Sequence, residues 1–344
     1  MLMVRAKAPQ KELGAPLIPD ASGTGLTFFK VPKLPRQLMR ESLLKATGNE
    51  ASAETMARAY RRLRRPLPDD LTDRVLRALM LSARIEWPTV VVIAHPDDET
   101  LAMAGRLAMF ERLTIVQLTD GAPSDGIDAN RLGFTERLSY SAERENETQR
   151  ALAVLGLDCP RLCLGVVDQQ SVFRISEIVH AVEVSLGGAR LVFTHPYEGG
   201  HPDHDTAALV VQWACARMAA AGHHPPRRFE FASYHHRDGQ MTTGEFWPEA
   251  DQPEIAVVLD GQAHALKRRA LAEYATQSDV IRGFCTAIER YRTAPHYDFS
   301  GPPPPGLAQY DLFGWAITAA RWRARAVSSL HLLQETRTWE SSRS

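Results

Sequence analysis

The sequence predicts an α/β protein whose mostly parallel sheet has helices on both faces. Short apolar runs such as Val90–Ile93 are typical of buried strands. They alternate along the chain with longer segments of helical character, which is the order that produces parallel sheets. Polar clusters follow two of these runs directly, at residues 95–99 and 201–205. Open α/β sheets bind their ligands beyond the carboxyl ends of the strands, so both clusters are expected at that edge.

The elements follow one another in regular order from residue 89 onwards. Gly105 lies inside the first expected helix and allows close packing there, and Gly156 ends the helix that begins near residue 136. A loop rich in Gly, Pro, Ser and Asp is expected at 121–134, and a shorter one at 166–169. Strands are expected at 89–94, 114–119, 161–165, 190–194, 228–234 and 254–259. Helices are expected at about 99–112, 136–155, 174–186, 205–221 and 262–275.

Two extensions flank this alternating region. Residues 1–87 form an N-terminal extension, in which an irregular arm precedes two helices separated by Pro66–Pro68. The second of these helices begins at Asp70 or Thr72, either of which can cap it. Residues 301–344 form a C-terminal extension that is helical in part. The sequence leaves the role of both extensions open. They could cover a sheet edge, form an oligomer interface or shape a substrate site.

Bulk composition describes an ordinary globular chain. Hydrophobic residues make up 44% and charged residues 24%, with a net charge of −1, which argues against general nucleic-acid binding. We expect no membrane span and no signal peptide, because long apolar runs are lacking. Four cysteines at irregular spacing favour reduced thiols and a cytoplasmic location. A basic stretch at 58–65 is either a solvated helix face or a docking surface for an acidic partner.

The two polar clusters carry the chemistry. His95, Asp97 and Asp98 follow the first strand, and His201, Asp203 and His204 follow a later one. Adjacent Asp residues at the start of a helix commonly cap that helix. For the first cluster taken alone, capping is as good an explanation as a functional site. Two histidines and one carboxylate, however, leave an open position for water, as catalytic zinc sites require. A neighbouring carboxylate that binds no metal can accept the proton of that water.

At this point the residues resemble a known family. The stretches His95-Pro96-Asp97-Asp98-Glu99 and His201-Pro202-Asp203-His204 look like the two hallmark motifs of the PIG-L / LmbE-like zinc deacetylases. Supporting matches include Thr119-Asp120-Gly121, Arg144 and Asp168. The resemblance extends over about residues 88–290, and the deacetylase-like domain is expected at 88–300. It implies a Rossmann-like α/β fold and removal of acetyl groups from N-acetylglucosamine-type sugars. The extensions have no counterpart in a minimal member.

The resemblance also implies roles for individual residues. His95, Asp98 and His204 match the metal ligands, and the expected metal is Zn²⁺, with Fe²⁺ as the alternative that such ligands also suit. Asp97 matches the general base. His201 matches the histidine that acts on the oxyanion or the leaving amine, and Asp203 would orient it.

Further residues receive less specific expectations. Arg144 and Asp168 fall where the family contacts sugar hydroxyls. Tyr197 either stabilises the tetrahedral intermediate or is a packing aromatic. Asp120 either lies behind a ligand histidine or belongs to a simple turn, and His195 is a candidate for lining the pocket.

Together these observations predict a metal-dependent hydrolase that removes the N-acetyl group from an N-acetylglucosamine-type sugar or glycoside. A small N-acetylated sugar is therefore the expected partner, and oligomerisation through the extensions stays open. Two alternatives remain. One is an amidase or esterase that uses the same site on a different acylated small molecule, and the other is a non-catalytic sugar-binding protein. A nucleotide-binding protein is disfavoured because no Gly-x-Gly-x-x-Gly follows the first strand.

Overall fold

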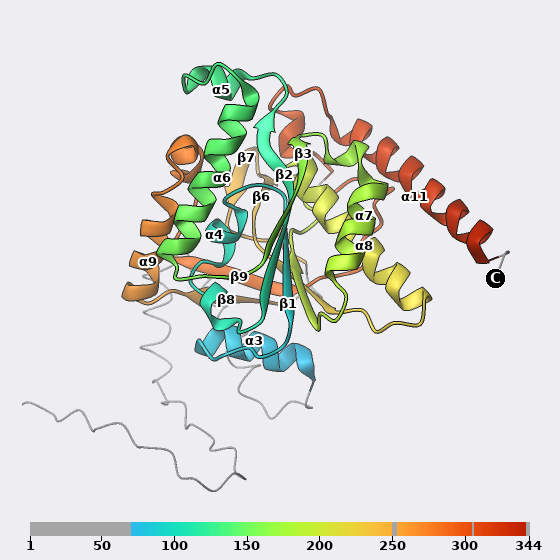
Figure 1. Cartoon of the computed structure of the whole chain (residues 1–344), viewed down its shortest axis with the longest axis horizontal. Helices are drawn as coiled ribbons and strands as arrows, with labels where there is room; N and C mark the ends of the chain where they lie inside the picture. The colour runs from blue at the N-terminus through green and yellow to red at the C-terminus, as the bar shows by residue number, and fades with distance from the viewer. Residues whose placement is uncertain (1–69, 250–252, 305, 342–344) are drawn as a thin grey trace, which may run out of the picture.

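The computed structural model describes residues 70–249, 253–304 and 306–341 (Figure 1). The expected arm, the first expected helix and the basic stretch at 58–65 lie outside the described residues. Within the described part, no helix is long and apolar enough to cross a membrane.

A seven-stranded sheet forms the centre of the fold. Its strand order is β3-β2-β1-β4-β5-β9-β8, and the first five strands in that order run parallel. β9 pairs antiparallel with both β5 and β8. The mostly parallel sheet predicted from the sequence is therefore confirmed, with an antiparallel edge added to it. The strands are β1 (Thr89–Ile93), β2 (Leu113–Pro123), β3 (Arg161–Asp168), β4 (Leu191–Thr194), β5 (Arg227–Phe231), β8 (Glu254–Val258) and β9 (Ile288–Thr293).

Helices cover both faces of this sheet (Figure 1). One face carries α3 (Leu71–Leu81), α4 (Asp98–Met103), α6 (Arg137–Val154) and α9 (Gly261–Leu271). The other face carries α7 (Ile175–Ser185), α8 (Pro202–Ala220) and the C-terminal α11 (Ala319–Ser341). Short helices α5 (Ile127–Arg131) and α10 (Ser278–Ile281) lie in the connections.

Strand β1 shows why the chain folds into these layers. All five of its residues are buried, and successive side chains point to opposite faces. Val91 and Ile93 join the core under α3, α6 and α9, whereas Val90 and Val92 join the core under α7, α8 and α11. A run of β-branched residues that is apolar on both faces is therefore satisfied only at the centre of a sheet covered on both sides.

Several elements differ from the expectation. The helix after β1 ends at Met103, because Gly105 packs so closely that a Cβ there would lie 2.4 Å from Leu259 Cδ2. The expected loop 121–134 contains α5, and the expected loop at 166–168 is instead the end of β3. The hairpin of β6 (Tyr234–Arg237) and β7 (Gln240–Thr243) was not predicted, because these polar segments lack apolar alternation.

Strand β9 was also missed, and a buried ion network explains the omission. Its Arg292 contacts Glu230 of β5 at 2.8 Å and Glu198, in the loop after β4, at 2.9 Å. All three side chains are almost fully buried. The charges that make this strand look exposed in the sequence therefore pair inside the protein, and they hold the loop after β4 against the antiparallel edge.

The direction of strand order changes between β1 and β4. From β1 the chain continues to β2 and β3 on one side, whereas β4 is followed by β5 on the other. Loops that leave the carboxyl ends of β1 and β4 therefore diverge, and a crevice opens between them. The first polar cluster follows β1, and His195 together with the second cluster follows β4, so the topology brings both clusters to one place.

Candidate metal centre and active site

The turn after β1 directs two adjacent carboxylates to different partners. Asp97 has a φ of 128°, a region that side-chain-bearing residues rarely adopt and that costs about 1–3 kcal/mol. Asp98 begins α4, and its Oδ2 accepts the backbone N–H groups of Ala94 at 3.1 Å and His95 at 2.7 Å. The strained turn thus fixes Asp98 against the end of β1 and leaves Asp97 to a separate set of contacts.

Three side chains place ligand atoms around one point. His95 Nδ1 lies 3.2 Å from His204 Nε2, and Asp98 Oδ1 lies 3.3 Å from the same His204 nitrogen. His95 Nδ1 lies 3.4 Å from the other carboxylate oxygen, Asp98 Oδ2, and one ligand atom from each of the three residues lies within 4.8 Å of the others. Ligand atoms about 2.0–2.1 Å from a zinc ion at tetrahedral angles lie about 3.3 Å from one another. The spacing of this triad therefore fits a tetrahedral metal with one position left open.

Both histidines of the triad are also held through their other ring nitrogen. His204 Nδ1 lies 3.1 Å from Ser233 Oγ, and His95 Nε2 lies 3.3 Å from Asp203 Oδ2. With Nε2 of His204 facing the metal position, its Nδ1–H donates to the serine hydroxyl. With Nδ1 of His95 facing that position, its Nε2–H donates to the carboxylate. Such partners fix the tautomer and the orientation of metal-binding histidines.

The electrostatics of the triad favour a cation. Despite burial, the pKa of Asp98 is held well below its usual value by His195 and His204. Burial and the neighbouring His195 lower the pKa of His204 to about 4, which keeps this imidazole neutral, the form that binds metals. In spite of its burial, His95 has a pKa well above its usual value because carboxylates, Asp168 foremost, surround it. A site that favours positive charge in this way also attracts a metal ion.

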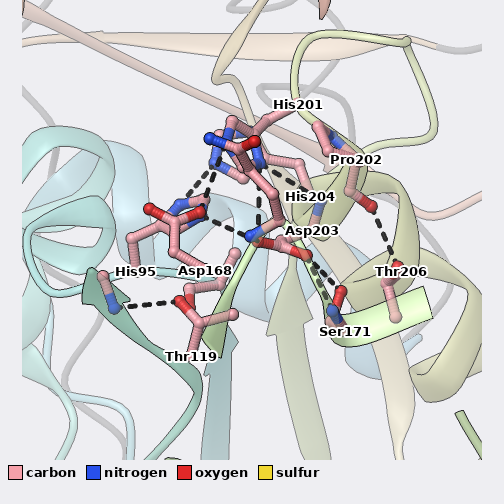
Figure 2. A network of polar contacts seen from close by, with 12 residues as sticks. His95, Thr119, Asp168, Ser171, His201, Pro202, Asp203, His204 and Thr206 are labelled. Atoms are coloured by element: carbon pink, nitrogen blue, oxygen red, sulfur yellow. Dashed lines mark hydrogen bonds and ion pairs between the residues drawn. The ribbon is translucent and has the colours of Figure 1, made fainter. Parts of the chain in front are cut away.

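A second group of residues, His95, Asp168, His201 and Asp203, also lies close together. Asp203 is already saturated, however. Its Oδ2 accepts the backbone N–H of Gln169 at 2.6 Å, and its Oδ1 accepts the backbone N–H and the hydroxyl of Ser171 (Figure 2). With these bonds made, Asp203 acts as a support for His95 rather than as a ligand. The triad of His95, Asp98 and His204 is therefore the better candidate for the metal.

Helix α8 supplies His201 and the residues after it. His201 caps the helix, Pro202 occupies its first turn, and His201 Nδ1 accepts the backbone N–H of Asp203 at 3.1 Å. The carboxylate of Asp203 lies 3.8 Å from the same nitrogen, beyond hydrogen-bond range. The backbone of Asp203, and not its carboxylate as expected, therefore orients His201. Burial also lowers the pKa of His201 well below its usual value, so the neutral ring carries its proton on Nε2.

Asp97 is held by Arg144 of helix α6. Arg144 Nη2 contacts Asp97 Oδ2 at 3.0 Å and donates to the carbonyl of Pro96, while Nη1 donates to the carbonyl of Gly121. Arg144 is almost fully buried, although it lines the cavity. Burial raises the pKa of Asp97 to about 8, and the Arg144 guanidinium acts against that rise. The expected contact of Arg144 with sugar hydroxyls stays a prediction, because the described contacts of this guanidinium are internal.

The remaining sequence candidates divide between the site and the core. Asp168 lines the cavity, with Oδ1 3.3 Å from His95 Nε2 and 3.7 Å from His201 Nε2. Tyr197 does not line the cavity formed by the described residues. Its hydroxyl donates to the carbonyl of Gly301, and its ring stacks on Trp322 with the centroids 5.4 Å apart. This location favours the packing role. Asp120 pairs with Arg137 and contacts no ligand histidine.

Several residues near the metal position were missed or underrated in the sequence. His195 stacks on His204 with centroids 3.9 Å apart, and its Nε2 lies 3.2 Å from Asp98 Oδ2. Tyr234 meets His204 edge to face, at 5.2 Å between ring centroids. Ser171 begins a short 3-10 helix and Ser233 lies in a loop, and no motif surrounds either. Of these residues, only His195 could be predicted from the sequence to lie near the site, because it directly follows a buried strand.

These groups open into a cavity of about 400 Å³. Its polar floor includes the triad, Asp97, Asp168 and His201. Its outer wall comes from segments far along the chain, among them the β6–β7 hairpin, α10 and residues 313–315. The C-terminal extension therefore contributes to the cavity, which is one of the roles left open by the sequence.

Comparison with known proteins agrees with this geometry. Residues 90–215 match the sequence profile of the family described as PIG-L: GlcNAc-PI de-N-acetylase. Over these residues the chain is similar to the PIG-L family. The resemblance noted from the two motifs is thereby confirmed, and both motifs lie inside the matched region.

Curated relatives of this chain come from Bacillus. A probable N-acetyl-alpha-D-glucosaminyl L-malate deacetylase 2 of Bacillus anthracis is 29% identical over 141 residues, which are 39% of this chain and 61% of that protein. The protein of the same description from Bacillus subtilis is 28% identical over 202 residues, 55% of this chain and 83% of that protein. The chain thus spans less than two thirds of the length of the first of these relatives.

Solved structures with a similar trace include further deacetylases. The A40926 pseudoaglycone deacetylase is 17% identical, with a TM-score of 0.47, and the match covers 62% of this chain and 99% of that one. A 4-carboxy-2-hydroxymuconate hydratase from Pseudomonas putida KT2440 is 16% identical with a TM-score of 0.43. That match covers 61% of this chain and 98% of the hydratase.

Proposed function

We propose that this chain is a metal-dependent hydrolase that removes the N-acetyl group from an N-acetylglucosamine-type sugar or glycoside. The observation that carries the proposal is the triad of His95, Asp98 and His204, whose ligand atoms lie within 4.8 Å of one another beside Asp97 in one cavity. The PIG-L profile match and the Bacillus relatives, which are described as deacetylases, support the same reaction.

The triad would hold Zn²⁺, and Fe²⁺ suits the same ligands. When bound, such an ion supplies a Lewis acid that lowers the pKa of a water molecule and polarises the amide carbonyl. In the overall reaction, water adds to the carbonyl carbon, the C–N bond breaks, and acetate and a free amine are released.

Asp97 is the proposed general base. It follows the first ligand histidine by two residues and precedes the ligand Asp98, yet the strained turn keeps its carboxylate apart from the triad. Burial raises its pKa to about 8, so the carboxyl holds a proton taken from water long enough to pass it to the leaving amine. Arg144 is the positioning residue for this carboxylate, because it bonds Asp97 and the carbonyls of Pro96 and Gly121.

His201 is proposed as a donor to the oxyanion. Since Nδ1 accepts the N–H of Asp203, the neutral ring carries its hydrogen on Nε2, which faces the cavity side of Asp168. A fixed N–H donor in a water-poor site stabilises the negative charge that develops on the carbonyl oxygen. Of the two roles that the sequence left open for His201, the tautomer favours this one.

The test combines metal content and amine release in one experiment. We expect about one metal ion per chain in the wild type, and metal-dependent amine release from a panel of N-acetylglucosaminides. Asp98→Ala should lose both. The matched control is Asp158→Ala, an exposed carboxylate before β3 that should keep both.

Each other outcome points to one of the alternatives. Metal binding without amine release, but with hydrolysis of an N-acyl amino compound or an ester, would favour the different acylated substrate. Tight sugar binding with no hydrolysis of any substrate would favour the non-catalytic protein. If Asp98→Ala retains full metal content, the ligand assignment is wrong.

A further inference from the structure

We propose that the cavity selects substrates that carry an uncharged apolar substituent close to the amide, rather than the dianionic malate conjugate named for the Bacillus relatives. The inference rests on the proposed function and specifies its substrate class. An apolar aglycone and a long N-acyl chain are the two sources of such a substituent, and the experiment below separates them.

The outer wall of the cavity is apolar and comes from four separate segments. Met241 belongs to β7, Val280 to α10, Phe284 to the following loop, and Phe313 and Trp315 to the C-terminal extension. Met241, Val280 and Phe313 are 41%, 52% and 41% exposed, which is high for such residues. Exposed apolar side chains that gather around one cavity mark a place where an apolar ligand is covered.

This wall is continuous with the reactive groups. Trp315 meets His201 edge to face at 4.9 Å between ring centroids, and Phe313 lies 4.8 Å from Trp315. On the other side, Phe284 meets Tyr234 at 5.8 Å, and Tyr234 in turn meets His204. An amide positioned at the triad therefore has aromatic surface next to it on two sides. A substituent a few carbon atoms long reaches that surface.

The cationic side chains of the cavity lining are already paired. Apart from the histidines of the floor, the lining formed by the described residues contains two cations, Arg144 and Arg290. Arg144 is bound to Asp97 and two backbone carbonyls, as described above. Arg290 contacts Glu254 at 2.8 Å and Glu245 at 3.5 Å. Neither guanidinium is available for a carboxylate of the substrate unless an internal ion pair breaks.

Carboxylates of the protein also face an incoming anion. Besides those of the floor, Asp128 and Asp279 line the cavity, and Arg131 is paired with both, at 3.2 and 3.4 Å. Like charges brought together during binding weaken it. A malate group, with its two carboxylates, would meet this surface without a free cation among the described lining residues, whereas an alkyl or aryl group would meet the apolar wall.

The experiment compares kcat/KM for four substrates on the metal-loaded full chain. They are methyl N-acetylglucosaminide, its hexyl analogue, methyl N-hexanoylglucosaminide and the malate conjugate. We expect the hexyl or the hexanoyl compound to exceed the methyl reference by about 10- to 100-fold, because each buried methylene contributes to binding. Preference for the hexyl compound locates the wall on the aglycone side, and preference for the hexanoyl compound locates it on the acyl side. The malate conjugate should fall below the methyl reference.

Two variants test whether this wall is responsible. Phe313→Ser should reduce the preference for the longer compound at least threefold, and Val280→Lys should raise kcat/KM of the malate conjugate relative to the hexyl compound. Val184→Ser is the control, since this exposed apolar residue lies on α7 outside the cavity lining. It should change neither ratio. Preferences that are the same in Phe313→Ser and wild type would overturn the assignment of the wall.

Binding measured by calorimetry separates failure of this inference from failure of the proposed function. If no compound releases amine but the hexyl or hexanoyl compound binds at least tenfold more tightly than the methyl reference, deacetylation fails and the apolar subsite stands. If amine is released equally well from the methyl, hexyl and hexanoyl compounds, or fastest from the malate conjugate, deacetylation stands and the apolar subsite is wrong.

Discussion

The floor and the outer wall of the cavity are built in different ways. The floor consists of buried polar side chains at the ends of β1 and β4, and nearly every one is fixed by a hydrogen bond or ion pair. The wall consists of half-exposed apolar side chains from segments after residue 230. The floor lies almost wholly inside the PIG-L match at 90–215, and the wall lies outside it.

This difference suggests that the floor carries the proposed reaction and that the wall determines which substrates are preferred. Groups that hold a metal and move a proton need positions fixed within a fraction of an ångström, and parallel strand ends with backbone contacts provide them. Groups that cover a substituent need only shape and polarity, which surface segments supply and can vary. Floor variants should therefore alter metal binding or turnover for every substrate, whereas wall variants should alter the ranking of substrates.

The largest effect is expected for Asp97→Asn. The substitution keeps the size of the side chain but removes the proton acceptor, so we expect kcat to fall about 10²- to 10⁴-fold while the metal is retained. KM should change much less than kcat, and the loss should be the same for the methyl and the hexyl substrate. Steady-state kinetics with metal analysis on the same samples checks this.

Asp158→Asn is the control for this variant and should behave as wild type. An Asp97→Asn protein with full turnover would show that another group accepts the proton. Loss of metal together with turnover would instead place Asp97 among the ligands, and the division between the two adjacent carboxylates would then be wrong.

A smaller effect is expected for Asp203→Asn, which sharpens the assignment of this residue as a support. Its carboxylate bonds Gln169, Ser171 and the ligand His95, so the amide would lose the charge that holds the His95 ring. Outer partners of this kind typically change metal affinity or activity about 10- to 100-fold. Competition with a chelator should therefore show weaker metal binding, and turnover should return at saturating metal.

Asp120→Asn serves as the matched control. Asp120 also combines a backbone N–H, from Ala122, with a cationic partner, Arg137, but it contacts no ligand histidine. Its metal affinity should equal that of the wild type. If Asp203→Asn keeps wild-type metal affinity but loses turnover that excess metal does not restore, Asp203 acts through His201, as the sequence comparison suggested.

The same difference explains how much could be predicted from sequence. The strand ends and the two polar clusters that meet there were predictable, because buried β-branched runs and polar residues directly after them leave a local signal. The choice of His95, Asp98 and His204 as the ligands came from the family resemblance and stays a prediction. The partner of Arg144 was not, since the contact with Asp97 joins residues 47 positions apart. Tyr197 lies near the second motif in sequence, yet the chain turns its ring into the core against Trp322. The apolar wall of the cavity could not be predicted from the sequence. Its residues are isolated apolar positions in polar segments, and only the fold brings them together around one cavity.

The smallest effect is expected where the floor depends on backbone shape alone, at Gly121. Its φ of +64° is strained for any other residue, and an added Cβ would lie 2.7 Å from Pro96 Cδ and 2.8 Å from Arg144 Nη1. Gly133 has a φ of +83° but open space around it, so Gly133→Ala shares the backbone cost of about 1–2 kcal/mol without the crowding. We expect urea denaturation to show that loss in both variants, and kcat to fall, by about tenfold, only in Gly121→Ala. The ratio of hexyl to methyl turnover should stay unchanged, because the wall is not touched. Equal kcat in the two variants would mean that Arg144 shifts without disturbing Asp97, and that the base is held mainly by its own strained turn.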